Sequence, residues 1–183
     1  MSIDLDLALP YLSPSQSPED TAPVHAYGSA DAPIVRPFSP SLLVSYVIDE
    51  PGALLFVRER DVPAKGTARE DLHARALTNL RRRVERKTVR FEPRGPISRA
   101  RLDGQHDASL LLLDEIWDAP ERLAGHEGDL LAIVPARGTL VFTATARAGA
   151  MQELRAHTER PSLSAEIFVR RDRCWHPLPI GTA

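Results

Sequence analysis

Two short apolar runs in the middle of the chain constrain most strongly how it can fold. Leu110–Leu113 and Leu130–Pro135 are its densest apolar stretches, and carboxylates and turn residues bound both of them. Runs of this length between turns are typical of buried strands, which need other elements to cover them. With 43% apolar residues over 183 positions, the chain can supply that cover. We expect six apolar side chains to be buried: Leu72, Leu80, Leu110, Leu112, Ile133 and Val141.

The residues around these runs predict antiparallel hairpins and two main helices. Each predicted hairpin pairs two β-branched or apolar stretches across a turn such as Pro51-Gly52. The order ββα-βββ(α)-ββα-ββ places the chain in the α+β class. Strands are predicted at 42–49, 53–59, 87–92, 97–102, 108–113, 129–135, 139–145, 164–170 and 173–178. Helices are predicted at 67–87 and 146–160, with short ones at 114–117 and 120–124.

The helix over 67–87 follows from a regular apolar stripe. Thr67 and Glu70 have the spacing of a capping box, in which each side chain satisfies a free backbone donor of the other. Apolar residues recur on one side at every fourth position: Leu72, Ala76, Leu80 and Val84. This side is predicted to face the core.

Proline is concentrated near the N-terminus. Of 16 prolines, seven lie between Pro10 and Pro40. Proline lacks a backbone donor, which disfavours helices and inner strands. We therefore predict a proline-rich arm over residues 1–40, with 1–33 kept out of the inner sheet, and a single α+β domain over 41–183.

Charge and cysteine content limit the classes of function. The formal net charge is only −2, so no global field favours nucleic acid or a membrane. Residues 58–101 nevertheless carry 14 basic and 6 acidic side chains, net +8. Cys174 is the only cysteine, which fits a reducing compartment. No secretory signal or membrane-spanning run is visible. We expect a soluble cytoplasmic protein.

Four segments resemble a known family in pattern, order and spacing. Leu43–Asp49, Ala76–Leu80, Gly104–Trp117 and Gly128–Phe142 resemble the YtpQ-like family of uncharacterised bacterial proteins, over roughly residues 40–180. The chain has Asp107 where the family usually has Glu, and Gly138 where it usually has Asp. The family has no established activity, so the resemblance implies a common fold and leaves function open.

Five polar residues form the candidate binding site: Asn79, Asp103, Asp107, Ser109 and Arg137. Asn79, inside the long helix, either faces a pocket or hydrogen-bonds a backbone group of an adjacent strand, because buried polar groups need partners. Arg137, at a hairpin tip, is predicted to pair with Asp107 or with Asp114.

The sequence assigns no catalytic residue, metal ligand or cofactor. Asp103 and His106 lack an established zinc spacing. His106, Asp107 and Ser109 are neighbours on a predicted strand, where successive side chains point to opposite faces and cannot converge as a triad. Cys174 and His176 supply only two ligands, and metal sites usually need three or four.

We expect non-catalytic binding of a macromolecular partner, either another protein or a second copy of this chain. One alternative is an enzyme with a polar site around Asn79, Asp107, Ser109 and Arg137, which requires a deep pocket where they converge. The other is a nucleic-acid-associated protein using the basic segment 81–101, which requires a continuous positive face.

Overall fold

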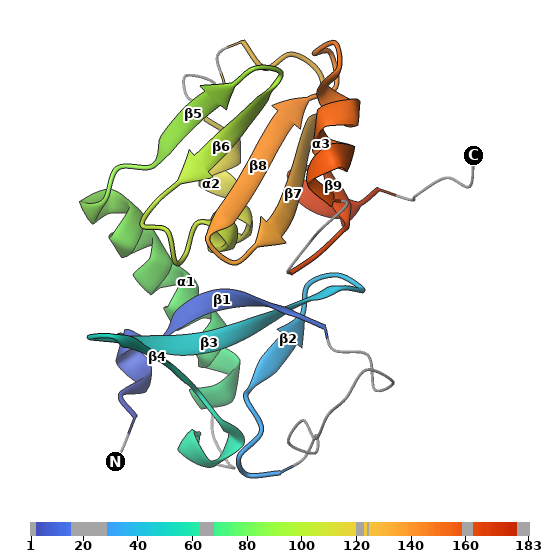
Figure 1. Cartoon of the computed structure of the whole chain (residues 1–183). Helices are drawn as coiled ribbons and strands as arrows, with labels where there is room; N and C mark the ends of the chain where they lie inside the picture. The colour runs from blue at the N-terminus through green and yellow to red at the C-terminus, as the bar shows by residue number, and fades with distance from the viewer. Residues whose placement is uncertain are drawn as a thin grey trace. The chain divides into compact units, whose positions relative to one another are not determined.

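A computed structural model describes residues 3–15, 29–62, 68–119, 123, 125–158 and 163–178. The chain divides into two compact units, Met1–Arg86 and Lys87–Ala183 (Figure 1). The boundary predicted after residue 40 therefore falls inside the first unit. The single α+β domain predicted over residues 41–183 stays a prediction.

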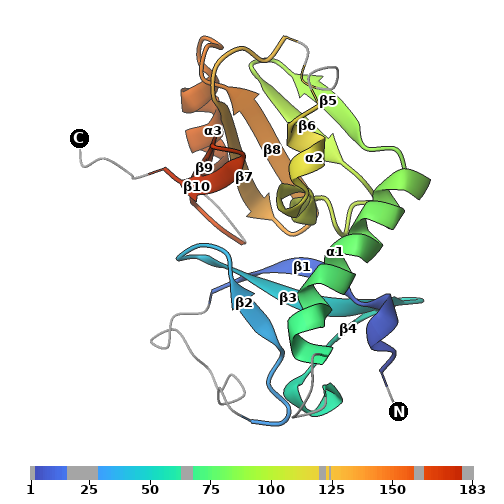
Figure 2. The same ribbon diagram turned by 180° about the vertical axis from the view of Figure 1, so that it is seen from behind.

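The described part of the first unit is a four-stranded antiparallel sheet with one long helix. Strand β3 is central and pairs with β1, β2 and β4, as Figures 1 and 2 show. Helix α1 packs against β1 and the short helix η1. The bounds are η1 Leu5–Leu7, β1 Leu9–Pro14, β2 Val35–Pro37, β3 Leu42–Glu50, β4 Ala53–Phe56, η3 Glu59–Asp61 and α1 Ala68–Arg86.

The apolar stripe forms the buried side of α1, as predicted. Leu72, Ala76 and Leu80 are fully buried, and Val84 is partly exposed. The predicted capping residue Thr67 lies outside the described residues. The hairpin β3–β4 is confirmed as well, with Gly52 in its turn at a φ of +81°, where glycine is favoured.

Residues 1–33 were predicted to stay out of the inner sheet, but residues 9–14 join the sheet as its edge strand β1. This strand pairs along its whole length with β3, with Pro10 opposite Tyr46 and Pro14 opposite Leu42. It lies at the end of the strand order β1-β3-β2. An edge strand accepts proline because only one of its sides has to donate hydrogen bonds to a neighbour. Residues 9–14 of the predicted arm are therefore an edge strand, and residues 16–28 lie outside the described residues.

The second unit is built on a six-stranded antiparallel sheet in the order β10-β9-β7-β8-β6-β5. Helix α3 covers one face, and the short helices η4 and α2 lie on the other (Figures 1 and 2). The bounds are β5 Arg90–Arg94, β6 Ile97–Arg101, η4 Ala108–Leu112, α2 Asp114–Trp117, β7 Leu130–Ala136, β8 Thr139–Ala144, α3 Ala150–Thr158, β9 Ile167–Arg171 and β10 Cys174–Pro177.

Each face of this sheet has its own apolar layer. Under α3 lies an aliphatic cluster: Ile97, Leu131, Ile133, Val141, Leu154, Ile167 and Val169. On the face with α2, Trp117 stacks on Phe91 at 5.7 Å between ring centroids and meets Phe142 edge-on at 5.2 Å. The run Leu130–Pro135 is thus buried, as the sequence predicted, from Leu130 to Val134, and Pro135 is partly exposed.

The predicted strand 108–113 is instead the 3-10 helix η4. Its backbone turns through i to i−3 hydrogen bonds, such as Leu110 N–H to the carbonyl of Asp107. Four successive leucines carry no period that separates strand from helix. This helix leaves Leu112 partly exposed, so the prediction that it is buried was wrong. The other five predicted side chains are buried.

The remaining elements confirm the α+β class with antiparallel hairpins and two main helices. The short helix α2 occupies the predicted residues 114–117, whereas the helix predicted at 120–124 lies outside the described residues, apart from Leu123. None of the described helices is both long and apolar enough to cross a membrane.

Candidate functional site

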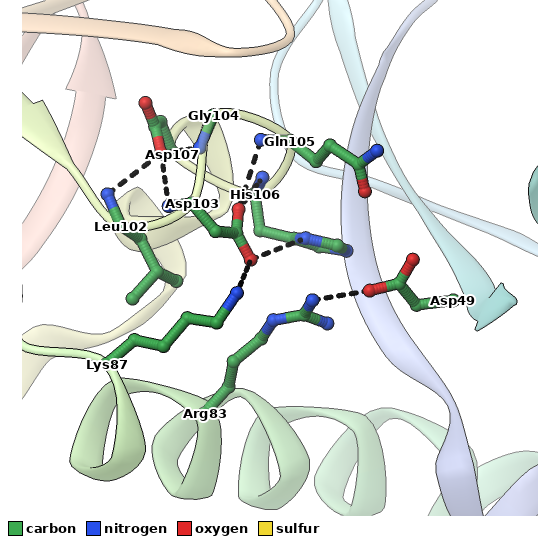
Figure 3. Close-up of polar contacts among 9 residues, drawn as sticks. All are labelled: Asp49, Arg83, Lys87, Leu102, Asp103, Gly104, Gln105, His106 and Asp107. Atoms are coloured by element: carbon green, nitrogen blue, oxygen red, sulfur yellow. Dashed lines mark hydrogen bonds and ion pairs between the residues drawn. The ribbon is translucent and has the colours of Figure 1, made fainter. Parts of the chain in front are cut away.

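The loop after β6, residues 102–107, is held together by a buried carboxylate. Asp107 is fully buried, and its Oδ1 accepts backbone N–H groups from Leu102 at 2.8 Å, Asp103 at 3.0 Å and Gly104 at 2.8 Å (Figure 3). Bonds from N–H groups to a carboxylate are stronger than neutral ones and compensate for its burial. Asp107 therefore fixes the shape of the loop.

The second carboxylate of the loop, Asp103, divides its two oxygens between backbone donors and charged side chains. Asp103 Oδ1 accepts the N–H groups of Gln105 at 3.0 Å and His106 at 2.8 Å. Its Oδ2 lies 3.3 Å from His106 Nδ1 and 3.8 Å from Lys87 Nζ (Figure 3). Burial alone would raise the pKa of Asp103, but the His106 ring and these backbone donors together lower it well below its ordinary value. The carboxyl is therefore ionised at neutral pH.

A polar pocket of about 410 Å³ opens beside this loop. It is about the size of small-ligand sites, but charged rather than apolar side chains line most of it. Its lining combines three cations, two carboxylates and three uncharged residues: Lys87, Arg90, Arg101, Glu92, Asp103, Thr88, Leu102 and Gly104.

Strand register places two arginines directly opposite each other at this pocket. Arg90 of β5 pairs with Arg101 of β6, and Glu92 pairs with Arg99. Alternate residues of a strand share a face, so Arg90, Glu92 and Arg94 lie on the same face as Arg99 and Arg101. Like charges directly opposite destabilise a sheet. Charges and Pro93 also protect β5, an edge strand, from pairing with other chains, so edge protection is the simplest explanation for them.

The two opposed arginines differ in their contacts. Arg101 Nε lies 3.5 Å from Oδ2 of the buried Asp107. Within the described residues, the Arg90 side chain makes no hydrogen bond or ion pair. The sequence had identified the basic segment but not these residues as a site. Counting outward from the Gly95 turn pairs position 90 with position 101 and could have indicated the juxtaposition.

The five predicted site residues are divided between the two units, and four of them, Asp103, Asp107, Ser109 and Arg137, belong to the second. Asn79 belongs to the first unit, where its Nδ2 donates to the carbonyls of Asp6 at 2.7 Å and Ala8 at 2.9 Å. Asn79 thus hydrogen-bonds neighbouring backbone, as one of its two alternatives stated, but the acceptors lie in η1 and directly after it rather than in a strand. Ser109 is buried, and in the part of the chain that the structure describes its hydroxyl has no hydrogen-bond partner. Of the five, Asp103 alone lines the pocket.

Arg137 lies exposed at the tip of the β7–β8 hairpin, and its carbonyl accepts the N–H of Ala108 at 3.4 Å. The carboxylates predicted as its partners carry other arginines: Arg101 lies near Asp107, and Arg170 contacts Asp114 at 3.1 Å. A pairing of Arg137 with either carboxylate stays a prediction.

Gly138, which follows Arg137 at the hairpin tip, packs its backbone against the 102–107 loop. A Cβ atom there would lie 2.0 Å from the carbonyl oxygen of Gly104, which is closer than any side chain can come. An aspartate, or any other residue with a Cβ atom, therefore has no room at this position. The glycine allows the hairpin tip to approach the 102–107 loop.

The described residues contain no cluster of three or more His, Cys, Asp or Glu side chains able to hold a metal ion. Cys174 and His176 both lie exposed on the edge strand β10.

The chain matches no family model, no curated protein and no solved structure. The resemblance to the YtpQ-like family accordingly stays a prediction.

Proposed function

We propose that this protein acts by binding a macromolecular partner, and that this partner is a protein presenting an acidic segment to β5 and β6. The observation that supports the proposal is a set of cations that we call the arginine face: Lys87, Arg90, Arg94, Arg99 and Arg101. Over residues 87–101 these five cations stand against the single carboxylate Glu92, a net charge of +4.

The arginine face is accessible. The side chains of Arg94, Lys87 and Arg101 are 66%, 50% and 37% exposed. Arginine is enriched in protein interfaces, and its planar fork binds carboxylates with two parallel hydrogen bonds. Arg99 is more restricted, because its guanidinium donates to the carbonyl of Gly138 and to Thr139 Oγ1, both at 3.0 Å. We therefore assign recognition chiefly to the other four cations.

The enzyme alternative is less well supported. It needs the polar residues to converge in a pocket, but Asp107 and Ser109 are buried away from solvent and neither lines the pocket. A general base works best with a pKa near the working pH. The contacts of Asp103 lower its pKa instead, which makes this carboxylate a weak base. Asp103 is better suited to positioning its neighbours.

Nucleic acid is the second candidate, because the same arginine face meets the requirement for a positive surface. Two observations favour a protein partner. The basic segment 81–101 is divided between the two compact units, and Arg83 of α1 already pairs with Asp49 in the first unit (Figure 3). Residues 102–183 carry 12 acidic and 8 basic side chains, which would repel a long polyanion.

A cytoplasmic setting belongs to the same proposal. Cys174 is exposed and is the single cysteine of the chain, and such thiols persist in reducing compartments. The acidic partner segment could also belong to a second copy of this chain, since the stretch from Asp103 to Asp129 is rich in carboxylates. Sedimentation of the purified chain distinguishes that outcome from a different partner.

The test compares two charge reversals in fluorescence anisotropy with a labelled Glu-rich peptide. Arg94→Glu, on the arginine face, should weaken binding about fivefold, as expected for reversal of one exposed interface charge. Arg155→Glu, on the exposed side of α3, makes the same change in net charge and should leave affinity unchanged. Equal weakening by both variants contradicts a defined site. Tighter binding of a labelled oligonucleotide, with log K linear in log salt, would favour nucleic acid.

A further inference from the structure

We infer that the pocket beside β5 and β6 is a subsite for a phosphate monoester, carried by a phosphorylated side chain of the protein partner. The inference rests on the proposed function and specifies the chemistry of that partner. It is carried by Arg90, Arg101 and Lys87, which line one pocket of about 410 Å³.

The register brings the two guanidinium groups within reach of one anion. Residues directly opposite on antiparallel strands have Cβ atoms about 4.5–5.5 Å apart, and Arg90 and Arg101 are such a pair. A phosphate monoester carries a charge of about −1.5 to −2 at pH 7 and offers three strong acceptor oxygens, whereas a carboxylate offers two. Three converging cations match the phosphate better.

The donors of these cations are largely unused. The ion pair of Arg101 with Asp107 involves Nε, and its terminal amino groups have no hydrogen-bond partner among the described residues. Lys87 Nζ is 3.8 Å from Asp103, longer than a hydrogen bond. Among the described residues, the Arg90 side chain has no hydrogen-bond partner and no ion-pair partner. The pocket therefore offers charged donors without first breaking strong internal contacts.

The nearby carboxylates keep their charge but already have other partners, which leaves Arg90 as the least compensated cation of the pocket. Asp107 and Asp103 are compensated by backbone N–H groups of the loop, three on the first and two on the second. Glu92 lies 3.8 Å from Arg94, which offsets it. Asp103 and Asp107 instead hold Lys87 and Arg101 at the pocket. Such preorganisation lowers the entropy lost when an anion binds.

Isothermal titration calorimetry of the full chain with three ligands tests the inference. The ligands are a phosphoserine peptide, the same peptide with Glu in place of phosphoserine, and free O-phospho-L-serine. The wild type should bind the phosphopeptide about tenfold more tightly than either of the others. Arg90→Gln should abolish that preference, and Arg155→Gln on α3 should retain it.

Three outcomes overturn the inference. Equal affinity for the Glu and phosphoserine peptides would show that the pocket does not recognise a phosphate group. If peptide binding still depends on Arg94 in that case, the proposed function remains supported. Equal affinity for free O-phospho-L-serine assigns the pocket to a small molecule. Unchanged phosphopeptide binding by Arg90→Gln would show that the pocket around Arg90 is not the phosphate subsite.

Thermal unfolding without phosphate separates a binding role for Arg90 from a structural one. Because Arg90 faces Arg101 directly, Arg90→Gln removes repulsion and should leave the melting temperature equal or higher. A lower melting temperature would make Arg90 a structural residue and would also overturn the inference.

Discussion

Two single residues, Asp107 and Gly138, shape the 102–107 loop beside the pocket. Asp107 supplies one oxygen to three backbone donors while fully buried. Gly138 leaves the space in which the Gly104 carbonyl lies. Neither residue lines the pocket, yet together they position Asp103 and Gly104, which do. Asp107, which the sequence singled out as a binding residue, therefore shapes the loop beside the pocket without lining it.

Removal of the Asp107 carboxylate should destabilise the protein strongly. Asp107→Ala leaves three backbone N–H groups without their acceptor, and we expect a loss of about 3 kcal/mol in the free energy of unfolding. Urea denaturation followed by circular dichroism measures it. Glu127→Ala, on an exposed loop of the same unit, should change stability by less than about 0.5 kcal/mol. A loss for Asp107→Ala no larger than that of the control would contradict the role of Asp107 in the loop.

At the scale of elements, the sequence predicted what its local patterns determine. The four-residue stripe identified α1, and turns such as Pro51-Gly52 identified the hairpins. It missed β1, because an edge position makes proline tolerable and edges are set by tertiary pairing. It missed η4, because four successive leucines have no period. The Arg90–Arg101 juxtaposition depends on strand register, so composition revealed the basic segment but not the pocket.

The strand β1 should contribute substantially to the stability of the first unit. Leu12 is 1% exposed within this strand, and Leu12→Ala should cost about 2–5 kcal/mol as a core truncation. Leu7→Ala is the matched control, because Leu7 is 57% exposed and should change little. Chemical denaturation of both variants provides the comparison. Similar midpoints for the two variants would support a dispensable N-terminal arm instead of a packed strand.

The contact between α1 and β3 should make the first unit sensitive to acid. His73 Nδ1 lies 3.1 Å from the Tyr46 hydroxyl, and burial, followed by the charge of Arg36, lowers the pKa of His73. Below its ordinary value of about 6.5 the unfolded chain then binds more protons than the folded chain. Stability should be complete above that pH and fall as the pH decreases toward the lowered pKa.

Urea midpoints measured across about pH 5–8 should show this slope in the wild type. The slope should decrease in His73→Gln, which cannot take up the proton. An unchanged slope in the variant would assign the acid sensitivity to other groups, such as the carboxylates of the second unit.

At the scale of the whole molecule, charge is segregated rather than abundant. The chain is nearly neutral, at −2, but residues 87–101 reach +4 on two neighbouring strands. Concentrating cations on one exposed edge costs stability through repulsion and gains directed recognition of an anion. We therefore propose that the arginine face is where this protein meets its partner.

Backbone amide chemical shifts, followed by NMR as a Glu-rich peptide is added to the full chain, test that claim most directly. The account predicts that the largest shifts fall in β5 and β6, Arg90–Arg94 and Ile97–Arg101, together with Lys87 and the 102–104 loop. The dissociation constant fitted to these shifts should rise about fivefold in Arg94→Glu and stay unchanged in Arg155→Glu. Largest shifts elsewhere, for example along the exposed edge strand β10, would contradict it.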